Sequence, residues 1–174
     1  MKKLYTIITI LIILPAYMYA QDIEEKKVKS KPVRAPFACP TVIDNQTVYI
    51  PTAKTLEFVI EHRFGKIENI SNLFGIYGSS NIRLGANYSI TNKLSVGYGI
   101  TKNRMLSDFR IKYNILEQTR DNKIPLALTA YGNMGIDGRN ETYFGQNYKF
   151  TNRLSYFAEL IVARKLTDWL SLQV

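Results

Sequence analysis

Residues 81–101 read NIRLGANYSITNKLSVGYGIT, and the order of apolar and polar residues in this stretch decides the fold. Apolar side chains occupy alternate positions over residues 82–90 and again over residues 94–100, with polar residues and glycines between them. A period of two is typical of β-strands whose two faces meet different surroundings. The connection TNK at 91–93 contains Asn92, a residue that favours a tight hairpin turn. This stretch therefore predicts an antiparallel pair of strands.

The same alternation predicts five further strands. They cover residues 56–64, 108–115, 126–133, 156–166 and 170–174. No helix of three turns is readable after the first twenty residues, so the sequence predicts an all-β, antiparallel up-and-down β-barrel with seven readable strands. Single-chain bacterial barrels close with an even number of at least ~8 strands. We therefore expect the chain to be a C-terminally incomplete fragment of a longer barrel.

The chain before the strands divides into two parts. Residues 1–20 begin with two lysines, continue with an apolar run and end in YMYA, which is the layout of a secretory signal peptide. The apolar run is shorter than the ~20 residues that a membrane-spanning helix needs. Residues 21–55 are rich in charged residues and contain prolines, and we interpret them as a polar N-terminal linker. The barrel domain is then expected over residues 56–174.

Alternation alone does not say whether the apolar face points inward, as in a soluble lipocalin-like barrel, or outward to lipid. Most of the predicted strands have a length that suits a tilted bilayer crossing. Long connections over 65–79 and 136–155 alternate with tight ones at 91–93 and 167–169, as in outer-membrane barrels. Tyrosines recur on the apolar face, where a membrane interface would hydrate their hydroxyls. These features favour a transmembrane barrel, and a soluble barrel that binds an apolar ligand is the alternative.

The polar face of the predicted strands carries charges of both signs. Its charged candidates are Glu57, Glu61, Arg63, Arg83, Asp108, Arg110 and Lys112. We expect these side chains to face the lumen with a structural role. A strongly anion-selective pore would carry a one-sided excess of positive charge, whereas a near balance predicts charges that pair across a narrow lumen and hold it shut.

The residues that could carry chemistry are few. With one histidine, His62, and one cysteine, Cys39, the sequence predicts neither a metal site nor a disulfide. Glu57 and Glu61 lie four apart on one strand face, about 13 Å from each other, which is too far to act on one bond. No Ser/His/Asp or Cys/His set is readable. We therefore predict no enzymatic activity, no catalytic residues and no cofactor.

The net charge of +9 raises the question of a nucleic-acid partner. The one basic cluster lies within residues 26–34, follows the acidic residues Asp22, Glu24 and Glu25, and lies next to Pro32 and Pro36, which is typical of a solvated segment. We therefore expect no nucleic-acid partner. The predicted location implies outer-membrane lipid and the barrel-assembly machinery as partners, and it leaves any small-molecule ligand unknown.

Five short segments also match a pattern found in one barrel family. They are EHRFG at 61–65, NIRLG at 81–85, ITNKLSVG at 90–97, PLALTA at 125–130 and LIVARKL at 160–166. On these segments, residues 56–174 resemble an uncharacterised outer-membrane β-barrel family of Gram-negative bacteria, a domain of unknown function. The resemblance implies a signal-bearing barrel in the outer membrane with a structural or passive transport or binding role. Because the family has no established activity, it implies no catalytic residues.

Overall fold

The computed structural model of the chain describes residues 30–33, 36–66, 71, 73, 76 and 78–174. The predicted signal peptide, residues 1–20, lies outside these residues. Seven strands form one antiparallel sheet in which each strand pairs with the next along the chain. They are β3 (Leu56–Arg63), β4 (Asn81–Ser89), β5 (Leu94–Thr101), β6 (Leu106–Leu116), β7 (Ala127–Ile136), β8 (Leu154–Lys165) and β9 (Ser171–Gln173). The prediction of an all-β, up-and-down antiparallel fold is confirmed.

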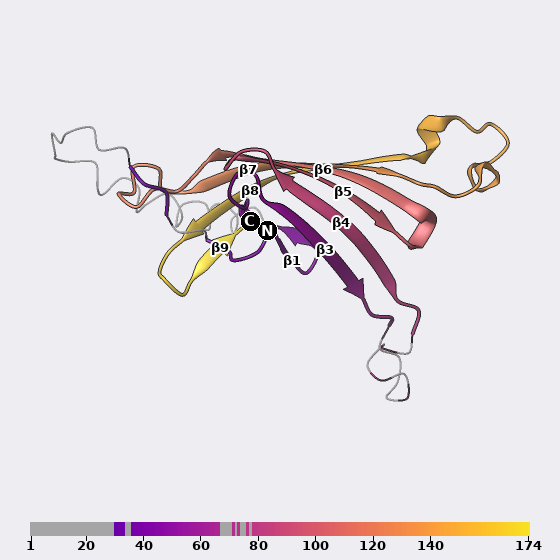
Figure 1. The fold of residues 1–174 in the computed structure, drawn as a ribbon, viewed down its shortest axis with the longest axis horizontal. Coiled ribbons are helices and arrows are strands. Elements are labelled where there is room, and N and C mark those ends of the chain that lie inside the picture. The colour runs from indigo at the N-terminus through magenta and orange to yellow at the C-terminus, as the bar shows by residue number, and fades with distance from the viewer. Residues whose placement is uncertain (1–29, 34–35, 67–70, 72, 74–75, 77) are drawn as a thin grey trace, which may run out of the picture.

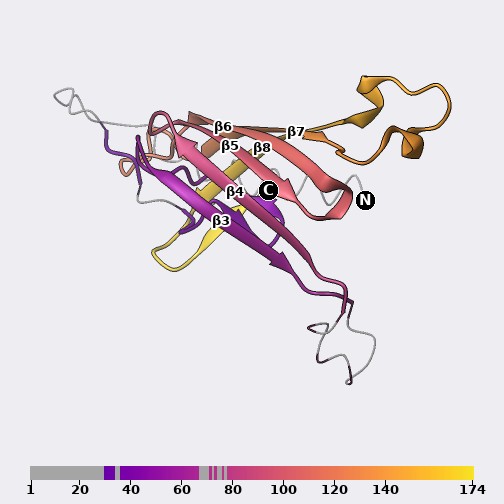
Figure 2. The same ribbon diagram turned by 45° about the vertical axis from the view of Figure 1, so that its right-hand side comes forward.

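The sheet curls into a half-barrel whose edges are β3 and β9 (Figure 1). Figure 2 shows the same curl from a second direction. The register keeps apolar residues opposite apolar residues, as where Leu84 faces Ile100 and Tyr98 faces Phe109. Because side chains alternate between the two faces, this register places most large apolar side chains of the strands on the same side. A single shift in register, at Asn114–Leu116, interrupts the pairing of β6 with β7.

The convex face of the half-barrel is apolar and exposed. Its large exposed side chains are Leu56, Phe58, Ile60, Ile82, Leu84, Tyr88, Tyr98, Ile100, Phe109, Ile111, Tyr113, Ile115, Tyr156, Leu160 and Leu172. Phe58 is 81% exposed and Leu160 is 66% exposed, so nothing in the described chain covers this face. Soluble monomers rarely expose a continuous apolar surface of this extent, which suits contact with lipid.

The connections between strands differ at the two ends of the sheet. Residues 90–93, 117–126 and 166–170 connect strands at one end, and residues 64–80, 102–105 and 137–153 connect them at the other (Figure 1). The two longest connections therefore share one end. Short 3-10 helices occur only at that end among the described residues. They are η2 (Asn103–Met105), η3 (Glu141–Phe144) and η4 (Phe150–Arg153). No helix of the described residues is long and apolar enough to cross a membrane.

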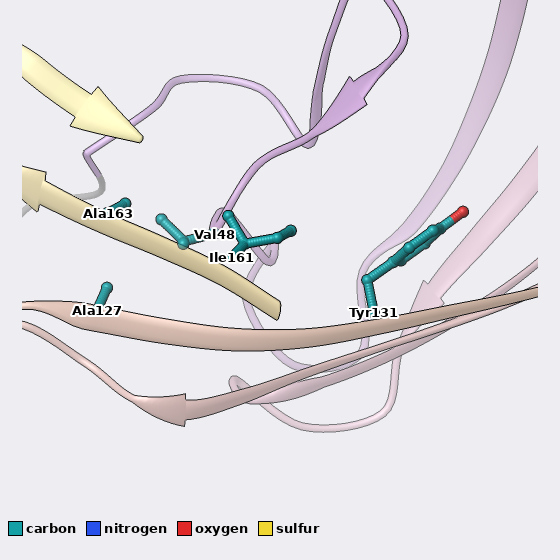
Figure 3. Packing of buried hydrophobic residues seen from close by; sticks show 5 residues of the cluster. All are labelled: Val48, Ala127, Tyr131, Ile161 and Ala163. Carbon is teal, nitrogen blue, oxygen red and sulfur yellow. The ribbon is translucent and has the colours of Figure 1, made fainter. Parts of the chain in front are cut away.

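Residues 36–50, which precede β3, lie on the concave side of the sheet. They contain a small hairpin of β1 (Thr41–Val42) and β2 (Asn45–Gln46), whose turn includes Ile43 at a φ of 56°. Two residues later, Val48 joins a buried apolar cluster with four sheet residues (Figure 3). These are Ala127 and Tyr131 of β7 and Ile161 and Ala163 of β8. The only buried apolar core within the described residues thus lies between this segment and the sheet.

Candidate functional site

Four charged side chains on strands β3, β4 and β6 are in direct contact on the concave face, near the end of the sheet that has the longest connections. We call them the ion cluster: Glu61, Arg83, Asp108 and Arg110. Arg83 is 4% exposed and donates two hydrogen bonds to the Asp108 carboxylate, from Nε at 2.7 Å and from Nη2 at 2.6 Å. Arg110 donates from Nε to Asp108 at 2.9 Å and from Nη1 to Glu61 at 3.0 Å. Glu61 also accepts from Arg83 Nη1 at 3.3 Å. Two cations and two anions make the cluster neutral.

The strand register and two glycines explain how Arg83 reaches Asp108. Glu61 of β3 lies directly opposite Arg83 of β4, but Asp108 lies two strands away on β6, opposite Gly99 of β5. A Cβ atom added at Gly85 or Gly99 would come within 3.0 Å of the Arg83 guanidinium. The absence of side chains at these positions therefore leaves the space in which the guanidinium crosses β5.

The three other charged candidates lie outside the ion cluster. Lys112 is buried and donates from Nζ to the carbonyl oxygen of Pro40 at 2.9 Å. Arg63 pairs with Asp44 at 2.5 Å, and both side chains are more than half exposed. Glu57 lines a cavity of about 30 Å³ together with Lys112, and its buried Oε2 has no hydrogen-bond partner among the described residues. A polar cavity of this size has room for water.

The concave face also has contacts that the sequence did not predict. Thr129 is fully buried and donates from Oγ1 to Asn114 Oδ1 at 2.7 Å, which joins β7 to β6. Gln118 donates to the Lys165 carbonyl at 3.0 Å and accepts from the Lys165 amide at 2.8 Å. The strand register brings Thr129 to Asn114, whereas Gln118 reaches Lys165 from the connection after β6. Nothing in the local sequence identifies either partner.

A second group of contacts organises the connection between β7 and β8. Arg139 forms a two-pronged ion pair with Asp137, with Nη2 to Oδ2 at 2.7 Å. Arg153 donates to the Asp137 carbonyl at 2.8 Å and stacks on the rings of Phe144 and Tyr148, with centroids 4.9 and 5.0 Å from its Cζ. The hydrogen bonds from Arg139 hold the pKa of the Asp137 carboxyl below its ordinary value of 3.8. The ion pair of Arg139 with Asp137 and the contacts of Arg153 therefore hold this connection in its observed shape.

The structure therefore brings together four of the seven charged candidates and separates the other three. Their arrangement is one of mutual pairing, and within the described residues no three or more His, Cys, Asp or Glu side chains are grouped as a metal site. Neither His62 nor Cys39 is part of the ion cluster. This arrangement can hold the strands together and fill space on the concave side of the sheet. It contains no nucleophile beside a base.

Comparison with known proteins identifies a matching family. A family model described as "membrane bound beta barrel domain (DUF5777)" matches residues 37–174. The match begins before β3 and so includes the hairpin on the concave side. No curated protein and no solved structure matches the chain.

Proposed function

The chain belongs to this family of membrane-bound β-barrel domains, and from that premise we propose that it is an outer-membrane barrel with a closed lumen and a structural or passive binding role. The observation that carries the proposal is the ion cluster. Its central cation, Arg83, is 4% exposed and directly bonded to both carboxylates of the cluster. Charges that line an open aqueous pore stay hydrated, whereas charges that are withdrawn from water need partners of opposite sign.

Three features support an outer-membrane location. Residues 1–20 have the layout of a signal peptide. Strands β3 to β8 contain 8 to 12 residues each, which suits a tilted crossing of the hydrocarbon layer. The two longest connections share one end of the sheet, as extracellular loops do in bacterial barrels. Outer-membrane lipid and the barrel-assembly machinery are the partners that such a location implies.

The distribution of residues between the two faces argues against the alternative of a soluble barrel that binds an apolar ligand. Such a barrel points its apolar face inward, around the ligand. Here the convex face is apolar and the concave face carries the ion cluster, Lys112 and Glu57. No enzymatic family is indicated, and we propose that the protein is not an enzyme, because the paired charges of the concave face leave no nucleophile–base set among the described residues.

Fractionation and conductance together test the proposal. The protein is expected in the outer-membrane fraction, resistant to extraction by high salt and by carbonate. Purified and reconstituted into planar bilayers, it is expected to give no sustained conductance. Recovery in the soluble periplasmic fraction would overturn the location. Stable ion-conducting steps would overturn the closed lumen.

A further inference from the structure

The segment that precedes β3 occupies the inside of the curled sheet. We call residues 36–50 the N-terminal segment. Its Val48 is 4% exposed and packs against β7 and β8, and the neighbouring Thr47 is 1% exposed (Figure 3). Val48 and Thr47 are buried because the sheet covers one side of the segment, and the segment in turn covers part of the sheet. The contact therefore shields residues of the concave face that would otherwise meet solvent.

Three polar contacts fix the N-terminal segment to strands that are far apart in the sheet. Lys112 of β6 donates to the carbonyl of Pro40 at 2.9 Å, and Gln173 of β9 donates to the carbonyl of Gln46 at 2.7 Å. Arg63, at the end of β3, pairs with Asp44. Both edge strands and the middle of the sheet therefore hold one short segment. A segment held this way spans the concave side from edge to edge.

The N-terminal segment also holds its own shape. The Thr47 hydroxyl donates to the Cys39 carbonyl at 2.6 Å, and the Thr47 amide donates to the Pro40 carbonyl at 2.9 Å. Together with the β1–β2 hairpin, these bonds close a compact unit. A unit with internal hydrogen bonds can move as one body, because leaving the sheet does not break them.

The packing between the unit and the sheet is incomplete. Cavities of about 30 Å³ and about 140 Å³ lie along the contact, lined on one side by segment residues such as Tyr49 and on the other by strand residues such as Asn114. Well-packed protein interiors contain few voids larger than a water molecule. Val48 is the only residue of the segment in the buried apolar cluster, beside which Phe37 is partly buried. The contact is thus closer to a docked interface than to a continuous core.

We propose that the N-terminal segment is a resident plug that docks inside the barrel, closes it next to the ion cluster, and can leave the sheet without unfolding it. The inference rests on the proposed function, since a plug has meaning only in a barrel. The plug is tethered where Pro32 forms a bridge with Thr119, in the connection between β6 and β7. The tether lies at the end of the sheet with the shorter connections, so the plug is anchored at that end.

Thiol labelling of the full chain, with Cys39 replaced by Ser, tests the plug. Thr129→Cys places a thiol on the concave face of β7 at a position with 0% exposure, flanked by Ala127 and Tyr131 of the plug contact. Ser155→Cys is the matched control, because it lies on the same face at an exposed position of β8. A polar maleimide should label the control rapidly and Thr129→Cys slowly. Replacing residues 37–48 with a Gly/Ser sequence of equal length should raise the rate at Thr129→Cys by about tenfold or more.

A milder variant and an independent measurement of membrane insertion distinguish undocking of the plug from misfolding of the barrel. Val48→Asp places a carboxylate in the apolar cluster and should raise the labelling rate at Thr129→Cys in the same direction. Vesicle flotation and heat-modifiable migration on gels report membrane insertion of each variant independently of labelling. If inserted variants label at the unmodified rate, the plug proposal is wrong. If the unmodified chain itself fails to float, the membrane proposal fails, while labelling in detergent still decides whether the segment covers β7.

Discussion

Replacing Asp108 with Asn should destabilise the barrel far more than the same change at an exposed aspartate. Asp108 is 3% exposed and accepts three hydrogen bonds, two from Arg83 and one from Arg110. Asn keeps the shape of the side chain but removes its charge. The ion cluster then holds two guanidinium groups and a single carboxylate, Glu61, so a buried region that was neutral carries one uncompensated positive charge.

The magnitude follows from the burial of the pair. Removing one partner of a buried ion pair costs about 3–5 kcal/mol, most of it the cost of leaving the other charge without compensation. The Arg83 side chain is 4% exposed, so water does not replace the lost carboxylate. Arg110 is 16% exposed and retains Glu61, which places the expected loss for Asp108→Asn at the low end, about 3 kcal/mol. Removing both charges with Arg83→Met and Asp108→Leu should cost less than the single change.

Denaturant titration of the refolded barrel in lipid vesicles measures these differences as changes in the free energy of unfolding. Asp168→Asn, in the exposed connection between β8 and β9, is the matched control and should change stability by no more than about 0.5 kcal/mol. The single variants Arg83→Met and Asp108→Leu, measured together with the double variant, complete a thermodynamic cycle that isolates the coupling of Arg83 with Asp108. Equal stabilities for Asp108→Asn and Asp168→Asn would refute the reasoning, since they would mean that the cluster charges are hydrated.

Three further predictions concern space, lipid and pH. Gly99→Ala should displace the Arg83 guanidinium and cost about 1–3 kcal/mol by chemical denaturation. Gly132→Ala should cost less, because its Cβ would lie 3.3 Å from Ile111 Cγ2, and equal costs would argue against the spacing role of Gly99. Leu84→Arg on the convex face should lower the free energy of unfolding in vesicles by about 2–4 kcal/mol if the site lies near the bilayer midplane, and Leu84→Met should change it very little. If Arg at position 84 is tolerated, the convex face does not contact lipid. The depressed pKa of Asp137 means that its pairing with Arg139 stabilises the loop above the ordinary carboxyl pKa of 3.8 and is lost as pH falls through the lower folded value. The Nε–H NMR signal of Arg139 should therefore stay protected down to about pH 4, and loss of protection near neutral pH would contradict the pairing.

The strands were predictable because each has two unlike faces. Alternation along residues 82–90 identifies both the strand and its apolar side, and a slip of one residue would put every apolar side chain on the wrong face. The charged candidates were found by the same rule. Their partners were not, because Arg83 meets Asp108 across an intervening strand, and that meeting depends on the register of two strand pairs and on the glycine at position 99.

The placement of the N-terminal segment lay beyond sequence reasoning for a different physical reason. Residues 36–50 have no period that would identify a buried face, and the sheet holds two of them, Pro40 and Gln46, through their backbone carbonyls. Any residue supplies a carbonyl, so these contacts leave no trace in side-chain chemistry. The prolines at 36 and 40 separate this stretch from the strands but do not say what it packs against.

The ion cluster and the plug occupy successive levels of the same concave face. Arg110 belongs to the cluster and also lines the small cavity beside the plug, so the two meet there. The cluster depends on charges that cannot separate without leaving one of them buried and unpaired, and such a contact resists opening. The plug depends on hydrogen bonds that water can replace and on a small apolar contact, and it opens at lower cost. If the plug and the ion cluster both close the lumen, removing the plug alone would expose β7 and leave the cluster as the remaining barrier. Access of a reagent to the concave face and ion conduction through the lumen are then separate properties of this barrel.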